Sequence, residues 1–173
     1  MPKLEVFFDY ICPYCLKGHN HLMELLPKFP GLEVEWYPCE SHPRPEQSRM
    51  HSDLCAQGMY FASEQGADLA EYHHRMYNAA LTERADVEDV DVLAEASDGL
   101  LNPDALREAL SGNRYADKVL ENNRLAWGAY GFPAVPSFRL DGITLESIPD
   151  VGVSKKQLEA LLEQAAQHTK FKE

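Results

Sequence analysis

The order of apolar and polar residues predicts a strand, a helix and a second strand at the start of the chain. Leu4 to Phe8 is a short run rich in β-branched and aromatic residues, which is typical of a buried strand. From Cys12 to about Lys28 apolar residues recur at helical spacing, and Pro13 is tolerated in the first turn, where an N–H has no helical partner. Leu32 to Tyr37 alternates apolar and polar, which predicts a strand. We therefore expect a β–α–β opening with two parallel strands.

The middle of the chain has helical spacing for roughly eighty residues. It follows a loop from Pro38 to about Glu46 that contains proline and histidine. Asp86 is a candidate helix start, and Asn102 is a predicted N-cap because Pro103 suits the first helical position. A further helix is expected over Tyr115 to Tyr130. This block reads as an all-helical insertion.

The end of the chain returns to strands and closes on a helix. A Gly- and Pro-containing segment breaks the helical pattern after Tyr130, and Ser137 to Leu140 reads as a strand. Asp141-Gly142 predicts a hairpin turn into a strand over Ile143 to Leu145. Ser154 with Gln157 has the capping-box spacing for a last amphipathic helix. The predicted order is β–α–β, helical insertion, β–β–α, an α/β fold.

Composition and charge narrow the possible partners. The 173 residues suffice for one well-packed core, and the formal net charge of −12 argues against nucleic acid or an anionic membrane as the main partner. No apolar run approaches the ~18 residues that span a bilayer. The apolar run that begins at Leu4 is too short for a secretory leader, so we expect a cytoplasmic protein whose thiols are mostly reduced.

Two of the four cysteines form a Cys-x-x-Cys pair, Cys12 and Cys15, at a predicted helix start. Unpaired N–H groups and the helix dipole stabilise a thiolate there. The spacing predicts Cys12 as the attacking thiolate and Cys15 as the resolving thiol of a disulfide exchange. A zinc site is the weaker interpretation, because Cys39 and Cys55 lie sixteen residues apart and no second Cys-x-x-Cys is present. We therefore expect no metal.

Cys39 and Cys55 are interpreted as buried thiols that act as small apolar side chains, in preference to a second, regulatory disulfide. His73 and His74 resemble a ligand pair only superficially. Neighbouring helix positions point about 100° apart, so one histidine is expected to be half-buried and the other solvated.

Two segments carry a resemblance to a known family. They are Phe8-Asp9-Tyr10-Ile11-Cys12-Pro13-Tyr14-Cys15 and Gly131-Phe132-Pro133-Ala134-Val135-Pro136-Ser137-Phe138. Together with the order of elements, they resemble the thioredoxin fold of the DsbA-like family, most of all its FrnE-type branch. The resemblance covers nearly the whole chain. It implies a thioredoxin-like domain over 1–40 and 131–173, with a helical insertion over 41–130.

The resemblance also implies roles for single residues. Pro136 matches the cis-proline that packs beside the Cys-x-x-Cys motif, and Val135 matches the residue whose backbone contacts substrate. Asp9 matches an acidic position that tunes Cys12 or, in the interpretation we slightly prefer, holds the active-site turn with a hydrogen bond. Pro13-Tyr14 between the cysteines is typical of glutaredoxins, which makes glutathione a candidate partner.

The sequence thus predicts an enzyme, a thiol–disulfide oxidoreductase that acts on disulfides of proteins or small molecules. It needs no cofactor, because two sulfur atoms carry the redox equivalents; glutathione or a thioredoxin-type reductant is a possible partner. Two alternatives stay open. One is a glutathione-dependent isomerase or transferase of the kappa-like group, similar to 2-hydroxychromene-2-carboxylate isomerases, which usually has Ser where Cys12 stands. The other is a non-catalytic binding module of the same fold.

Overall fold

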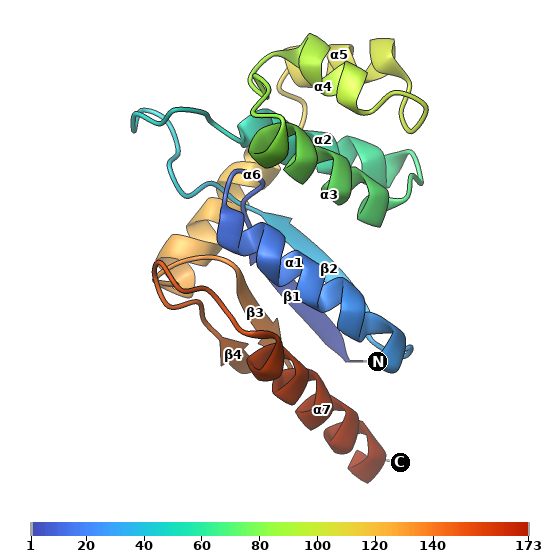
Figure 1. Ribbon diagram of the computed structural model, residues 1–173, viewed down its shortest axis with the longest axis vertical. Coiled ribbons are helices and arrows are strands. Elements are labelled where there is room, and N and C mark those ends of the chain that lie inside the picture. The colour runs from blue at the N-terminus through green and yellow to red at the C-terminus, as the bar shows by residue number, and fades with distance from the viewer. Residues whose placement is uncertain (1, 173) are drawn as a thin grey trace.

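The computed structural model describes residues 2–172 and contains one mixed sheet (Figure 1). Its strands are β1 (Lys3–Phe8), β2 (Glu33–Pro38), β3 (Ser137–Leu140) and β4 (Ile143–Leu145), in the order β2-β1-β3-β4. Strand β1 pairs in parallel with β2 and antiparallel with β3, and β3 pairs antiparallel with β4. The predicted α/β fold is confirmed, and each predicted strand lies within one residue of its expected bounds.

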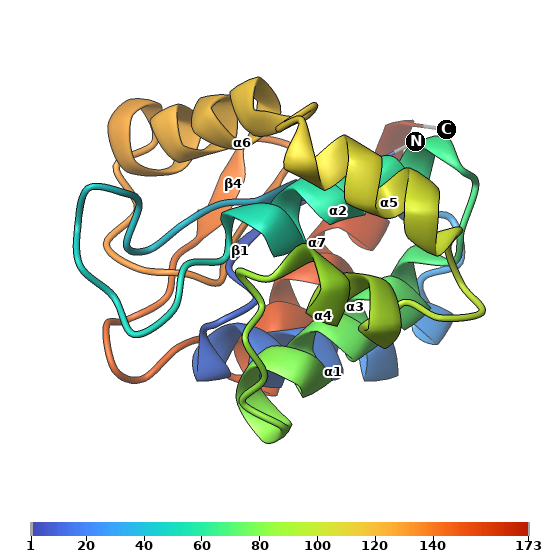
Figure 2. The ribbon, with the colours of Figure 1, turned by 90° about the horizontal axis from the view of Figure 1, so that it is seen from above.

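Helices cover both faces of this sheet. Helix α1 (Pro13–Leu25) packs against α7 (Lys155–Lys172), and α7 also contacts β3 and β4. Helix α6 (Ala116–Asn123) contacts β2 and lies on the side of the strands opposite to α1 and α7 (Figure 2). The predicted first helix ends earlier than expected: residues Leu26–Lys28 form a 3₁₀ turn, η1, whose second residue is a proline without an N–H to donate.

Between β2 and β3 the only regular secondary structure of the described chain is helical. These are α2 (Asp53–Glu64), α3 (Leu69–Tyr77), α4 (Val90–Ala96), α5 (Pro103–Ser111) and α6, with π-helical turns η2 (Asn78–Thr82) and η3 (Arg124–Ala129). The loop after β2 runs on to Ser52, six residues beyond the predicted end. The helix expected over Tyr115 to Tyr130 is α6 continued by η3.

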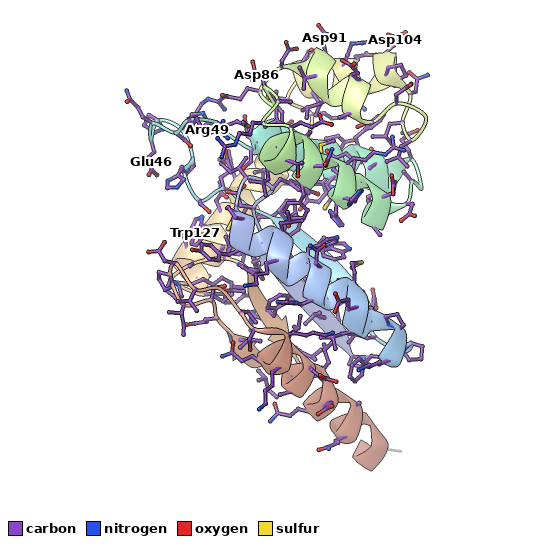
Figure 3. The ribbon with its side chains drawn as sticks, in the orientation of Figure 1. Glu46, Arg49, Asp86, Asp91, Asp104 and Trp127 are labelled. Carbon is purple, nitrogen blue, oxygen red and sulfur yellow. The ribbon has the colours of Figure 1, made fainter. Side chains whose placement is uncertain are left out.

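Helix ends follow the predicted capping residues with one exception. Asn102 Oδ1 accepts a hydrogen bond from Ala105 N at 2.9 Å, and Ser154 exchanges hydrogen bonds with Gln157. The exception is Asp86, labelled in Figure 3, which accepts from Glu88 N in a turn, while Asp89 caps α4. The helix cannot begin earlier because the residues after Asp86 form that turn first.

The buried side chains form one continuous cluster that extends from the sheet into the helical region. The division into a thioredoxin-like domain and an insertion therefore stays a prediction. His73 is fully buried rather than half-buried, and His74 is exposed. The His73 ring packs against Trp36, and its Nδ1 shares a hydrogen bond of 2.7 Å with the Tyr10 hydroxyl. Its Nε2 is buried without a hydrogen-bond partner among the described residues.

Among the described residues, no helix is both long enough and apolar enough to cross a membrane.

Candidate functional site

The site begins at the turn that joins β1 to α1. Asp9 follows the strand, its Oδ1 accepts a hydrogen bond from Ile11 N at 3.1 Å, and its carbonyl accepts from Cys12 N at 3.1 Å. These two bonds fold the chain into a tight turn, which is the local geometry that aspartate favours. Cys12 is the N-cap of α1 and Pro13 is its first residue, so the helix starts at the first cysteine.

The two thiols of the Cys-x-x-Cys motif lie in different environments. Cys12 is partly exposed, whereas Cys15 is buried inside the first turn of α1. A hydrogen bond from the Cys15 thiol lowers the pKa of Cys12, and backbone N–H groups of the helix start act in the same direction. Burial, and then the neighbouring Cys12, raise the pKa of Cys15 well above the usual value. The geometry therefore pairs an accessible, acidified thiol with a buried, protonated one.

The segment before β3 completes the site from the other end of the chain. The Cys12 thiol donates a hydrogen bond of 3.7 Å to the carbonyl oxygen of Val135, and the Val135–Pro136 peptide bond is cis. The Val135 side chain is buried. None of the described residues accepts a hydrogen bond from the Val135 N–H. A backbone donor and a backbone acceptor thus lie beside the accessible thiol.

Pro136 is held in place by close packing and by serine hydroxyls. A Cβ atom added at Gly18 in α1 would lie 2.8 Å from Pro136 Cγ, so the helix can approach the proline only with glycine at this position. The Ser147 hydroxyl donates to the Pro136 carbonyl, and Ser137 Oγ donates to Ala134 O at 2.8 Å. These contacts fix the Val135 backbone against Cys12.

Asp9 is buried and ties the turn to the loop after β2. Its Oδ2 accepts a hydrogen bond from Ser41 N at 2.8 Å, in addition to the bond between Oδ1 and Ile11 N. Burial raises the pKa of the Asp9 carboxyl although these hydrogen bonds oppose the shift. The negative charge of Asp9 in turn raises the pKa of Cys12, against the larger effect of Cys15. The residue is therefore placed for both roles that the sequence suggested.

Tyr14 packs against the loop between β4 and α7. Gly152 in that loop has a φ of +84°, and a Cβ atom added there would lie 3.3 Å from Tyr14. Ile148 and Val151, in the same loop, are 57% and 63% exposed. An apolar surface thus borders the cysteines and Pro136.

Several residues of this site were missed in the sequence. Gly18 had a usable signal, because a glycine inside an amphipathic helix often marks a close approach of another chain segment. Ser147, Ile148 and Val151 had none, since serine and apolar residues in a loop are common. Their importance comes from position alone.

The other two cysteines, Cys39 and Cys55, differ chemically from the exchange pair. Cys39 and Cys55 are buried free thiols, and Cys39 donates to Phe8 O at 3.4 Å. Burial raises the pKa of both thiols. Within residues 2–172 as described, no group of three or more His, Cys, Asp or Glu side chains could hold a metal ion. These observations agree with the interpretation of Cys39 and Cys55 as small apolar side chains.

Comparison with known proteins relates this geometry to a family. A model of the DSBA-like thioredoxin domain matches residues 3–149. YwbO of Bacillus subtilis, an uncharacterized protein, is 24% identical in a match that covers 78% of this chain and 84% of YwbO.

Solved structures share the fold at low sequence identity. A "probable DsbA oxidoreductase" from Streptomyces coelicolor superposes with a TM-score of 0.80 at 20% identity, covering 96% of this chain and 91% of the other. DsbA from Chlamydia trachomatis superposes with a TM-score of 0.72 at 17% identity, covering 96% of this chain and 87% of the other. BdbD from Bacillus subtilis superposes with a TM-score of 0.70 at 16% identity, covering 96% of this chain and 88% of the other. The chain therefore belongs to the DSBA-like thioredoxin domain family, whose members are thiol–disulfide oxidoreductases.

Proposed function

We propose that this protein catalyses dithiol–disulfide exchange through Cys12 and Cys15, with Cys12 as the nucleophile. The observation that carries the proposal is the position of the accessible Cys12 thiol between the Cys15 thiol and the Val135 carbonyl. A lowered pKa raises the thiolate fraction of Cys12 at neutral pH, and thiolate is the species that attacks a disulfide. In this proposal the Val135 backbone holds the chain that carries that disulfide.

The reaction has two steps in the direction of substrate reduction. The Cys12 thiolate attacks one sulfur of the substrate disulfide, the Cys12–substrate bond forms, the substrate S–S bond breaks, and the released thiolate takes up a proton. Cys15 then loses its proton and attacks Cys12. The second substrate thiolate leaves, and both cysteines end as one disulfide. Substrate oxidation is the same sequence in reverse.

The proposed docking of a peptide substrate is supported by the surroundings of Val135. An extended chain can pair with the free N–H of Val135 and with its carbonyl, which otherwise accepts only from the Cys12 thiol, as an added strand pairs with a sheet edge. Apolar substrate side chains would contact Ile148 and Val151. The substrates proposed are disulfides of proteins or small molecules, with glutathione as the small-molecule partner and no cofactor.

One measurement tests the function and its direction together. The Cys12–Cys15 couple is equilibrated with a series of reduced and oxidised glutathione, and the oxidised fraction is read by alkylation and mass spectrometry. A reversible two-electron couple is expected within the span of roughly −270 to −120 mV for Cys-x-x-Cys proteins. Failure to form a Cys12–Cys15 disulfide at any ratio would favour the isomerase or the binding module. The cytoplasmic location stays a prediction that cell fractionation would check.

A further inference from the structure

A cavity of about 180 Å³ lies between the loop after β2 and helices α2 and α6. None of the residues of the exchange site lines it. Its lining combines the charged side chains of Glu40, Arg44 and Asp53 with apolar ones, including Val119 and Leu120 of α6. Leu120 is 59% exposed, so the cavity opens beside an apolar side chain on the surface.

Glu40 is the most constrained charged group of this cavity. The residue is 6% exposed, its N–H donates to Asn123 Oδ1 at 2.7 Å, and its Oε2 accepts from Asn123 Nδ2 at 2.9 Å. The indole N–H of Trp127, a residue labelled in Figure 3, donates to the Glu40 carbonyl at 2.8 Å. The other carboxylate oxygen, Oε1, receives no hydrogen bond from any described residue. Asn123 thus fixes one oxygen of the Glu40 carboxylate, while Oε1 is not fully buried and is open to a ligand or to water.

Arg44, the cationic residue of the lining, does not pair with every carboxylate oxygen of the cavity. Arg44 donates to Asp53 Oδ2 at 2.7 Å and is shared with Glu88. Asp53 Oδ1 is buried and has no donor among the described residues. Burial raises the pKa of Glu40, and repulsion from Asp53 and Asp9 adds to this shift, while the hydrogen bond from Asn123 and a weaker attraction to Arg44 oppose it. The cavity therefore has an excess of negative charge and of unused acceptors.

The cavity is also connected to the exchange site. Glu40 precedes Ser41, whose N–H donates to Asp9 Oδ2 at 2.8 Å. The Asp9 carbonyl accepts from Cys12 N at 3.1 Å. Two hydrogen bonds thus separate the backbone that carries Glu40 from the nucleophile.

We infer that this cavity binds the guanidinium or ammonium group of a basic side chain on the disulfide-bearing substrate. The inference rests on the proposed function, and it adds a preference for arginine or lysine near the reacting cysteine. The cationic head would donate to Glu40 Oε1 and offset the excess charge, while its aliphatic stem lies along Val119 and Leu120. An anionic group would be repelled by Glu40 and Asp53. The net charge of −12 attracts cationic substrates over longer distances.

The binding test does not depend on redox chemistry. N-acetyl-arginine amide is titrated into ¹⁵N-labelled protein, and the indole N–H of Trp127, one of two tryptophans, is followed by NMR. A saturable shift is expected, with N-acetyl-norleucine amide giving none. Glu40→Gln should weaken binding roughly ten-fold, since it replaces a charge-assisted hydrogen bond by a neutral one of the same shape. Glu95→Gln, at an exposed position of α4, makes the same change in net charge and should bind normally.

No saturable shift in the unmodified protein, or equal affinity in Glu40→Gln, would overturn the inference. Should Glu40→Gln fail to fold, Leu120→Lys serves instead. Leu120 is exposed, so the substitution is tolerated, and its ammonium would compete for the cavity. Binding that is unchanged in Leu120→Lys would count against the cavity as the site.

The second arm identifies the source of the cation. Two disulfide peptides that differ only in arginine or norleucine near the cysteine are compared for their rate of exchange with the reduced protein. The arginine peptide should react several-fold faster, and Glu40→Gln should remove that difference. Equal rates despite binding of the arginine amide would overturn the substrate assignment and indicate a free small cation. Absence of exchange with both peptides would instead contradict the proposed function, while the NMR titration still decides the cavity.

Discussion

The Cys12 thiol donates a hydrogen bond of 3.7 Å to the carbonyl oxygen of Val135, a residue 123 positions later in the chain. The contact joins the helix start after β1 to the segment before β3. Because β1 and β3 pair in the sheet, the fold itself brings the two segments together. The nucleophile and the backbone proposed to hold its substrate are therefore parts of one structural unit.

The order of alkylation tests the assignment of the nucleophile. Cys12 should react first with iodoacetamide at neutral pH, because the Cys15 hydrogen bond and the helix start lower its pKa. The alkylation rate should reach half its maximum at a pH below about 8.5, the pKa of a free cysteine. Brief labelling followed by mass spectrometry checks this. Equal labelling of all four cysteines, or first labelling of Cys15, would remove Cys12 from its role.

Trapping separates a dithiol mechanism from a monothiol one. Cys15→Ser should accumulate mixed disulfides through Cys12, since no second thiol resolves them, whereas Cys12→Ser should accumulate none at that site. Non-reducing electrophoresis after incubation with a disulfide substrate shows the adducts. Full turnover by Cys15→Ser would mean that the exchange does not need Cys15.

Gly18→Ala tests the close packing of α1 on Pro136. Alanine normally stabilises a helix interior by roughly 0.5–1 kcal/mol relative to glycine, but here its Cβ would meet Pro136 at 2.8 Å. Overpacking of this kind costs about 1–3 kcal/mol, so the variant should unfold at lower denaturant concentration. Gly128→Ala is the matched control, because nothing lies within 4 Å of an added Cβ there. Equal effects of the two substitutions would contradict the packing argument.

Asp9→Asn should make Cys12 more acidic, because the Asp9 charge raises the pKa of that thiol. The pH profile of alkylation should move to lower pH in the variant.

The stability of the Asp9→Asn variant should also depend differently on pH. Burial raises the pKa of folded Asp9 above 3.8, so its contribution to stability is present below pH 3.8 and is lost as pH rises through the raised pKa. Denaturant titrations across that window should show a flatter pH dependence in Asp9→Asn.

The apolar loop beside Tyr14 should matter for peptides and not for small reagents. Ile148→Ser with Val151→Ser should raise the KM for a disulfide peptide roughly five-fold, as expected for the loss of about 1 kcal/mol of apolar contact. Alkylation of Cys12 should stay unchanged. Ile143→Ser on β4 is the control, since Ile143 is also exposed, at 45%, and lies in another segment. An equal effect of the control substitution would remove the loop from the binding surface.

Local sequence determined most of the elements and the reactive pair. The strand Leu4–Phe8, the turn at Asp9 and the helix start at Cys12-Pro13 each depend on neighbours within a few residues, and each was predictable from them. The caps at Asn102 and Ser154 were predictable for the same reason, since a cap is a hydrogen bond across three residues. The helix start expected at Asp86 was wrong because two nearby aspartates offer competing turns.

Only the tertiary structure decided which distant residues surround the cysteines. Gly18 against Pro136, Ser147 against the Pro136 carbonyl, and Glu40 against Asn123 are contacts between segments far apart in the chain. The depth of burial was equally undecided, since the same histidine is solvated or fully buried according to what packs over it. Hydrogen bonds and spacing within a turn are set by local geometry, whereas contacts across the core depend on how all the elements pack at once.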